Sequence, residues 1–201
     1  MLTSPQAACV GFVLTGGRSS RMGKEKALLE INGTPLVVRT VDLLQRVCSS
    51  VTIVGRPERY AAFGYAGIAD EQADSGPLAG ILAALTATAS PWNVIVAVDM
   101  PYLSDEWLRY LIGRARASPA QVVMPVSREG PEPLCAVYHR NAAAPIREAM
   151  GRGVLKVTRA LEALAIERIE PDEIEPFDLR GLLFQNLNAP EDYERARADL
   201  G

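Results

Sequence analysis

The sequence is poor in cysteine and histidine, with three cysteines and one histidine among 201 residues. The cysteines, Cys9, Cys48 and Cys135, are widely spaced, whereas a disulfide framework or a structural zinc site needs closely spaced pairs. They therefore indicate buried thiols in a reducing compartment. No apolar run approaches the roughly 20 residues of a membrane-spanning helix, and the first residues lack the pattern of a secretory signal. These absences predict a cytoplasmic protein that contacts no membrane.

A strong charge of one sign is also missing, because the formal net charge is −3 at pH 7. A protein that binds nucleic acid usually carries a basic surface, so we expect no nucleic-acid partner. What the sequence does have is a hydrophobic fraction of 48%, which is enough to bury a core in a chain of this length. We expect a single domain that spans residues 1–201.

Short apolar segments alternate with stretches of helical periodicity along most of the chain. Predicted strands lie at residues 10–14, 51–54, 67–69, 94–98, 122–125, 134–138 and 166–169. Predicted helices lie at residues 35–47, 77–87, 142–150 and 155–165, after Ser104 as N-cap, and from Pro190 onward. Strands that alternate with helices predict an α/β, Rossmann-like fold, in which helices cover both faces of a mostly parallel sheet.

A segment rich in glycine, hydroxyl and basic residues follows the first predicted strand, from Leu14 to Lys26. Glycines let backbone N–H groups approach phosphate oxygens closely, and the hydroxyls and cations complete the cradle. The spacing matches neither G-x-x-x-x-G-K-[ST] nor G-x-G-x-x-G. The composition favours a polyphosphate site over the alternative of a solvated surface turn.

Asp99 stands at the end of the most hydrophobic predicted strand, before Met100 and Pro101. In an open parallel sheet, ligands bind beyond the carboxyl ends of the strands, so Asp99 and the glycine-rich segment should share one edge. Mg²⁺ typically takes one or two carboxylates together with substrate phosphates. Asp99 is therefore a candidate magnesium ligand; the alternative is that its carboxylate caps a turn.

A second glycine-containing segment begins the helix predicted at residues 77–87. Gly76 and Gly80 around an apolar helix start could form a flat wall for a nucleotide base, with Asp70 near enough for a polar contact. The alternative is structural, because Asp74 or Ser75 could cap the helix while the glycines only allow close packing.

Six segments carry further motifs: residues 14–29 (LTGGRSSRMGKEKALL), 32–36 (NGTPL), 76–80 (GPLAG), 99–101 (DMP), 132–138 (EPLCAVY) and 186–191 (NLNAPE). In this order, over nearly the whole chain, they resemble the molybdenum cofactor guanylyltransferase family. The first motif is shared by many nucleotidyltransferases. The segments at 76–80, 132–138 and 186–191 narrow the resemblance to the guanylyltransferases.

The resemblance implies a fold of the nucleotide-diphospho-sugar transferase type, with a nucleotide-binding part at about residues 8–118 and an acceptor-binding part at about residues 119–201. It implies Mg²⁺-dependent transfer of GMP from GTP to molybdopterin, which yields molybdopterin guanine dinucleotide and pyrophosphate. Proteins that deliver the cofactor or mature molybdoenzymes are further possible partners.

The same resemblance assigns residues to the site. The nucleotide-binding set is Leu14, Thr15, Gly16, Gly17, Lys26, Asp70, Gly76, Pro77, Leu78 and Asp99. The resemblance also makes Asp99 the metal ligand. Lys26, Arg21 and Asp99 form the catalytic set, because fixed cations favour a transition state in which negative charge builds on the phosphates. The family also has an asparagine after its second strand, but this chain has Gly55 and Arg56 there, so that contact is not carried over.

The tail motif leaves two alternatives open for its asparagines. Asn188 could cap the last helix together with Glu191, or Asn186 and Asn188 could face the site and hold the acceptor or the metal. Elsewhere, we expect His139 to be structural or a rim contact. Three basic residues could present a positive face to the pterin phosphate: Arg152, Lys156 and Arg159.

Two other functions compete with guanylyl transfer. One is a CTP-dependent nucleotidyltransferase on the same fold, with a molybdopterin or isoprenoid acceptor. The other is a non-catalytic nucleotide-binding module. The choice of nucleotide distinguishes the first alternative from guanylyl transfer. Pyrophosphate release in the presence of acceptor distinguishes the second alternative from guanylyl transfer.

Overall fold

A computed structural model describes residues 9–16, 25–70 and 76–201. The strands in these ranges are β1 Cys9–Leu14, β2 Glu30–Ile31, β3 Thr34–Pro35, β4 Val51–Gly55, β5 Gly67–Ala69, β6 Trp92–Ala97, β7 Val122–Ser127, β8 Gly130–Pro131, β9 Cys135–His139 and β10 Ile166–Ile169. The α-helices are α1 Leu36–Gln45, α2 Pro77–Thr86, α3 Asp105–Ala117, α4 Ala143–Gly151, α5 Val157–Ala160, α6 Pro171–Ile174 and α7 Pro190–Leu200. Short 3₁₀-helices are η2 Lys26–Leu28, η3 Pro57–Phe63, η5 Arg140–Ala142 and η6 Glu175–Phe177.

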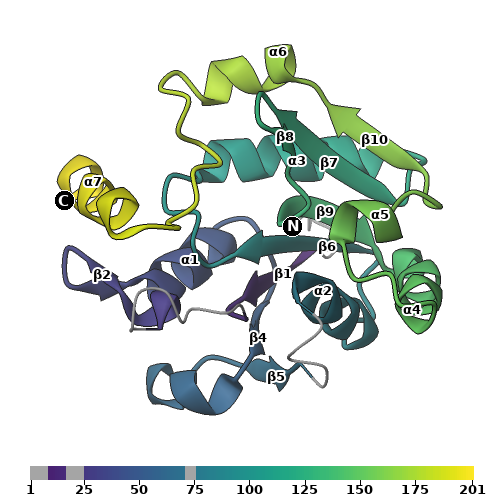
Figure 1. Ribbon diagram of the computed structural model, residues 1–201, viewed down its shortest axis with the longest axis horizontal. Helices are drawn as coiled ribbons and strands as arrows, with labels where there is room; N and C mark the ends of the chain where they lie inside the picture. The colour runs from purple at the N-terminus through teal and green to yellow at the C-terminus, as the bar shows by residue number, and fades with distance from the viewer. Residues whose placement is uncertain (1–8, 17–24, 71–75) are drawn as a thin grey trace, which may run out of the picture.

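The main sheet has the strand order β10-β7-β9-β6-β1-β4-β5, with β8 paired to β7 (Figure 1). Strand β1 pairs in parallel with β4 and β6, β4 with β5, and β7 with β10. Only β9 runs against its neighbours along this order, antiparallel to β6 and β7. A short connection can join β7 to β9 because antiparallel strands need no crossover. The predicted mostly parallel sheet is confirmed.

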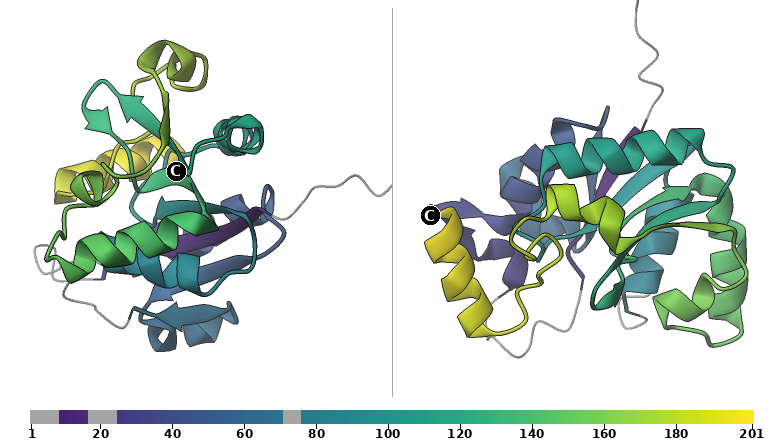
Figure 2. Two further views of the ribbon diagram at one scale, coloured as in Figure 1. Left: turned by 90° about the vertical axis from the view of Figure 1, so that its right-hand side faces the viewer. Right: turned by 90° about the horizontal axis from the view of Figure 1, so that it is seen from above.

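Helices cover both faces of the sheet, as predicted, and each face has its own hydrophobic core (Figures 1 and 2). Helices α1, α3, α6 and α7 contribute to one core, and α2, α4 and α5 contribute to the other. Because successive side chains of a strand point to opposite faces, β6 supplies Val94 and Val96 to the first core and Ile95 to the second.

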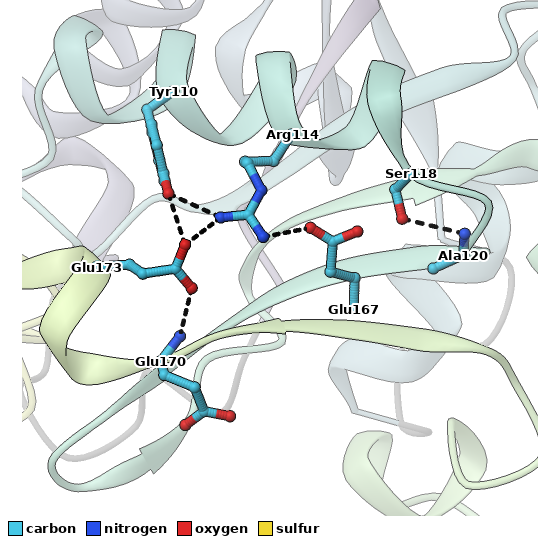
Figure 3. Close-up of polar contacts among 7 residues, drawn as sticks. All are labelled: Tyr110, Arg114, Ser118, Ala120, Glu167, Glu170 and Glu173. Carbon is cyan, nitrogen blue, oxygen red and sulfur yellow. Dashed lines mark hydrogen bonds and ion pairs between the residues drawn. The ribbon is translucent and has the colours of Figure 1, made fainter.

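Helix α3 is fixed at its start and along its outer side. Its start is as predicted: the Ser104 hydroxyl accepts a hydrogen bond of 3.2 Å from the backbone N–H of Trp107. Further along, Arg114 forms an ion pair of 2.7 Å with Glu167 of β10 and a second pair with Glu173 of α6 (Figure 3). The hydroxyl of Tyr110 donates to the same Glu173 carboxylate at 2.9 Å. These contacts link α3 to the end of the sheet.

The predicted helix at 155–165 is too long, and only α5 Val157–Ala160 is observed. Leu161 and Leu164 pack in the core through a turn instead of a continued helix. The carbonyl of Ala165 then accepts hydrogen bonds from the backbone N–H groups of Gln121 and Val122, so the chain enters β10 directly. The helical periodicity of this segment is therefore overridden by pairing with β7.

The prediction of buried thiols is confirmed for two of the three cysteines. All three cysteines are free thiols; Cys9 and Cys135 are buried and Cys48 is partly exposed. Over residues 9–16, 25–70 and 76–201, no helix has both the length and the apolar character needed to cross a membrane.

Candidate active site

Three neighbouring strands of the sheet, β1, β4 and β6, end at one edge and position the segment that follows β1. The backbone N–H of Thr15 donates to the carbonyl of Val54 at 2.9 Å, and the N–H of Val98 donates to the carbonyl of Leu14 at 3.1 Å. The Thr15 hydroxyl also donates to the Val54 carbonyl at 2.9 Å. These bonds fix the start of the glycine-rich segment between β4 and β6, beside the strand that leads to Asp99.

Lys26, Asp99 and Asn188 meet at this edge from three distant parts of the sequence. The Lys26 ammonium lies 2.9 Å from Asp99 Oδ2 and donates to Asn188 Oδ1 at 3.2 Å. The Lys26 and Asp99 side chains are each 19% exposed, so the pair is reached by solvent from one side. The structure thus brings together a predicted phosphate-binding lysine, a predicted metal ligand and a predicted acceptor residue.

Asn188 does not cap α7, contrary to the first of the two alternatives. The N-cap is Ala189, and Asp192 supplies the capping carboxylate. Asp192 Oδ2 accepts from the backbone N–H of Ala189 at 2.9 Å and from that of Asn188 at 3.0 Å, and these bonds hold the pKa of Asp192 below its ordinary value. The Asn188 side chain is therefore available to face Lys26. The signal in the sequence was the carboxylate at the third helical position, which reaches back to the N-cap.

The other tail asparagine, Asn186, makes a local contact. Its side-chain amide donates to the carbonyl of Phe184 at 3.4 Å. Between the two asparagines, the N–H of Leu187 donates to the carbonyl of Asp99 at 3.0 Å. The tail is thus joined by its backbone to Asp99 after β6 and by the Asn188 side chain to Lys26.

A narrow pocket opens at the same edge, between the ends of β1 and β4 and the start of α2. Its lining residues are Leu14, Gly16, Val54, Gly55, Asp70, Gly76, Pro77 and Gly80. Five of these were predicted nucleotide-binding residues: Leu14, Gly16, Asp70, Gly76 and Pro77. The side chain of Leu78 is fully buried in the core instead, so only its backbone could serve the nucleotide. Gly17 and Arg21 lie outside the described residues.

Gly55 lines this pocket without having been predicted. Its φ is +138°, a conformation that side chains rarely allow, and a Cβ there would lie only 2.6 Å from the Thr15 hydroxyl. Gly55 therefore lets the segment after β1 pack closely against β4. A glycine directly after a buried strand was the available signal.

His139 lies far from the Lys26–Asp99 pair, at the opposite edge of the sheet, because β9 runs antiparallel to β6. Its ring packs edge-on against Trp92 at 4.9 Å, and Nδ1 accepts from the backbone N–H of Asn141 at 3.3 Å. Burial lowers the pKa of His139, so the imidazole is mainly neutral at pH 7. This placement agrees with the expected structural role.

Comparisons with known proteins place the chain in a family. Residues 11–166 match the MobA-like NTP transferase domain. The chain is 36% identical to a probable molybdenum cofactor guanylyltransferase of Natronomonas pharaonis, over 94% of this chain and 97% of the relative. It is 30% identical to the molybdenum cofactor guanylyltransferase of Syntrophotalea carbinolica, over 92% of this chain and 89% of the relative.

The fold has close structural relatives as well. The crystal structure of molybdopterin-guanine dinucleotide biosynthesis protein A from Archaeoglobus fulgidus superposes with a TM-score of 0.82 at 28% identity, over 94% of this chain and 97% of that one. The sheet and its helices thus have the nucleotide-diphospho-sugar transferase fold that the resemblance implied. The chain belongs to the MobA-like NTP transferases and, within them, to the molybdenum cofactor guanylyltransferases.

Proposed function

We propose that this protein transfers GMP from GTP to molybdopterin, forming molybdopterin guanine dinucleotide and pyrophosphate. The observation that carries the proposal is the meeting of Lys26, Asp99 and Asn188 at the edge of the sheet. Lys26 comes from the glycine-rich motif, Asp99 follows β6, and Asn188 comes from the tail motif, so three predicted features form one site. The names of the relatives supply the identity of the two substrates.

The chemistry needs positioned charge more than a reactive side chain. An oxygen of the acceptor's terminal phosphate attacks the α-phosphorus of GTP, and the bond from that phosphorus to the bridging oxygen of pyrophosphate breaks. Negative charge develops on the oxygens around the α-phosphorus and on the leaving group, where the Lys26 ammonium can stabilise it. Arg21 is a second proposed cation. The acceptor phosphate is already ionised at neutral pH, so the reaction requires neither a protein nucleophile nor a general base.

The oxygens around Lys26 fit a divalent cation. Asp99 Oδ2 and Asn188 Oδ1 converge on one cation position, which the Lys26 ammonium takes in this structure. Within the described ranges, no three His, Cys, Asp or Glu side chains cluster as a metal site, so the nucleotide and water would complete the coordination. Mg²⁺ suits such a site because it binds one or two carboxylates together with substrate phosphates. When bound, the ion would neutralise charge on the phosphates.

The remaining roles are assigned by place. The residues that line the pocket between β1, β4 and α2 would form the wall against which the guanine base lies, with the Asp70 carboxylate among the polar groups there. The acceptor would lie on the side of residues 119–201, within reach of Asn188. Both parts share one sheet, and we propose that residues 1–201 act as one domain. We also propose that other proteins deliver the cofactor to this protein and receive the product from it.

A nucleotide panel and an acceptor-dependent assay test the function. Melting temperatures with GTP, CTP, ATP and UTP in the presence of Mg²⁺ report base choice, because a ligand at about 100 times its dissociation constant stabilises the fold by ~2.7 kcal/mol. We expect GTP to give the largest shift, and pyrophosphate to appear only when GTP and molybdopterin are both present.

Each alternative has its own result in these assays. A larger shift with CTP would replace the proposal by a cytidylyltransferase. GTP binding without acceptor-dependent pyrophosphate release would replace it by a non-catalytic module. Repeating both assays with EDTA tests the need for the metal, and full turnover without a divalent ion would contradict the assignment of Asp99 as a metal ligand.

A further inference from the structure

Two side chains from η3 hold Glu25, the residue directly before Lys26. The Tyr60 hydroxyl donates a short hydrogen bond to Glu25 Oε1, and Arg59 Nη1 lies 2.5 Å from Glu25 Oε2. Both oxygens of the carboxylate are therefore engaged, which fixes its orientation. A carboxylate held in this way is a fixed point in the chain, next to the lysine of the proposed site.

Tyr60 is the buried member of this group. Its side chain is 1% exposed and belongs to the core that contains α1 and Ala27 of η2, whereas the Arg59 side chain is 45% exposed. Burial raises the pKa of Tyr60, and the hydrogen bond to Glu25 raises it further. An exposed ion pair adds little to stability, so the Tyr60 contact is the stronger restraint on Glu25.

Thr15 is the residue after β1 that is bonded to Val54, and Glu25 is the residue before η2. In the sequence, these two residues flank the stretch from Gly16 to Lys24. Each end of the glycine-rich segment is therefore anchored by its own hydrogen bond, Thr15 to Val54 and Glu25 to the buried Tyr60 hydroxyl.

The direction of Lys26 follows from how its neighbours are held. On one side stands the restrained Glu25, whose carbonyl accepts from the N–H of Leu28 at 3.0 Å. On the other side is Ala27, which is buried in the core. The long side chain of Lys26 would otherwise sample many rotamers. With both neighbours fixed, it leaves the backbone toward Asp99 and Asn188.

We infer that Tyr60 is a positioning residue for the transfer reaction, because its hydroxyl holds the Glu25 carboxylate and so fixes the direction of Lys26 at the phosphate site. The inference rests on the proposed function for the identity of the reaction. The Tyr60 side chain is buried away from the open side of the site, and both carboxylate oxygens of Glu25 are engaged. Loss of the hydroxyl should therefore change the reaction through Lys26 alone.

The test removes the hydroxyl and keeps the ring. In Tyr60→Phe we expect kcat/KM for GTP to fall about 10- to 100-fold, mainly through kcat, because small misplacements of a catalytic group have effects of this size. Glu25→Ala should reproduce the loss. Glu25→Gln should retain much of the activity, because its side-chain oxygen still accepts from Tyr60. The double variant Tyr60→Phe/Glu25→Ala should be no worse than Glu25→Ala alone, since Glu25→Ala already removes the contact with Tyr60.

Tyr65→Phe is the matched control. The Tyr65 hydroxyl donates to Asp42 at 3.4 Å, and its ring packs on the same core, but it has no contact with the glycine-rich segment in the described structure. It should keep the wild-type kcat/KM. Equal kcat/KM in Tyr60→Phe and Tyr65→Phe would overturn the inference, and so would a loss that the unfolded fraction of Tyr60→Phe fully explains.

The outcome stays distinguishable from failure of the proposed function. If wild type releases pyrophosphate and Tyr60→Phe does so equally well, only the inference on Tyr60 fails. If wild type transfers no nucleotide to molybdopterin, the proposed function fails, and the dissociation constant of GTP becomes the readout. A GTP affinity about tenfold weaker in Tyr60→Phe than in Tyr65→Phe would then still support the positioning of Lys26, and equal affinities would overturn it.

Discussion

Replacing Asp99 by asparagine separates the charge of this side chain from its place in the fold. Asparagine has nearly the same shape and keeps an oxygen that can face Lys26. At the observed 2.9 Å, the attraction between the two charges is about 6 kcal/mol at an effective dielectric constant of about 20. Desolvation and side-chain ordering offset most of this, so an ion pair that solvent still reaches contributes about 1 kcal/mol to stability. For a chain of this size, that corresponds to a fall in Tm of roughly 2–4 °C.

The effect of Asp99→Asn on the reaction should be much larger. Removing one positioned charge from a site where negative charge develops commonly lowers kcat by about 10² to 10³, which is about 2.7–4 kcal/mol. Initial rates of pyrophosphate release with GTP, Mg²⁺ and molybdopterin give kcat, and circular dichroism gives Tm on the same samples. Turnover close to wild type would refute the role of Asp99 in catalysis. A fall in Tm far beyond the expected range would instead show that Asp99 serves mainly the fold.

Three further changes follow from named contacts. Asn188→Ala removes the oxygen that lies 3.2 Å from the Lys26 ammonium, and we expect kcat to fall about tenfold in the same assay. An unchanged kcat would contradict the assignment of Asn188 to the site. Gly55→Ala forces a Cβ against the Thr15 hydroxyl at a φ of +138°, so urea unfolding should show a loss of about 1–3 kcal/mol, and wild-type stability would contradict the reasoning. Burial alone would raise the pKa of Glu173, but its hydrogen bonds and ion pair hold the pKa below the ordinary value of 4.5. The ionised Glu173 therefore stabilises the fold fully above pH 4.5, and this stabilisation is lost as the pH falls through the lowered pKa. The difference in unfolding free energy between wild type and Glu173→Gln should accordingly shrink in acid; a difference independent of pH would argue against this ion pair.

The regular part of the fold was predictable because its signals are local. The strand at residues 67–69 was predicted with its observed bounds, and Ser104 was recognised as an N-cap from its position before an apolar helical pattern. The short hairpin β2–β3 was missed, although its turn residues Asn32 and Gly33 both have positive φ and form a favoured hairpin dipeptide. Its strands have two residues each, too few for any periodicity to show.

The site was predictable where a residue sits at the end of a strand. Asp99 could be placed from the sheet edge alone, because ligands collect beyond the carboxyl ends of parallel strands. Tyr60 carried no such signal. It lies in a 3₁₀-helix, and its partner Glu25 is 35 positions away in the sequence, so its contact depends on how two connections pack against each other. Such contacts are set by the tertiary structure and have no pattern in a single sequence.

The tail reaches the site through its backbone, and this determines how the site can respond to a ligand. Leu187 is buried in the core and bonds to the carbonyl of Asp99, while the N–H of Asn188 bonds to Asp192. Asn188 is therefore held in place without the help of Lys26. Because these anchors are separate from the Lys26–Asp99 ion pair, the lysine can exchange the carboxylate for phosphate oxygens while the tail stays where it is. An arrangement of this kind keeps its dipoles fixed during the reaction, and the transition state gains most from groups that need not reorganise.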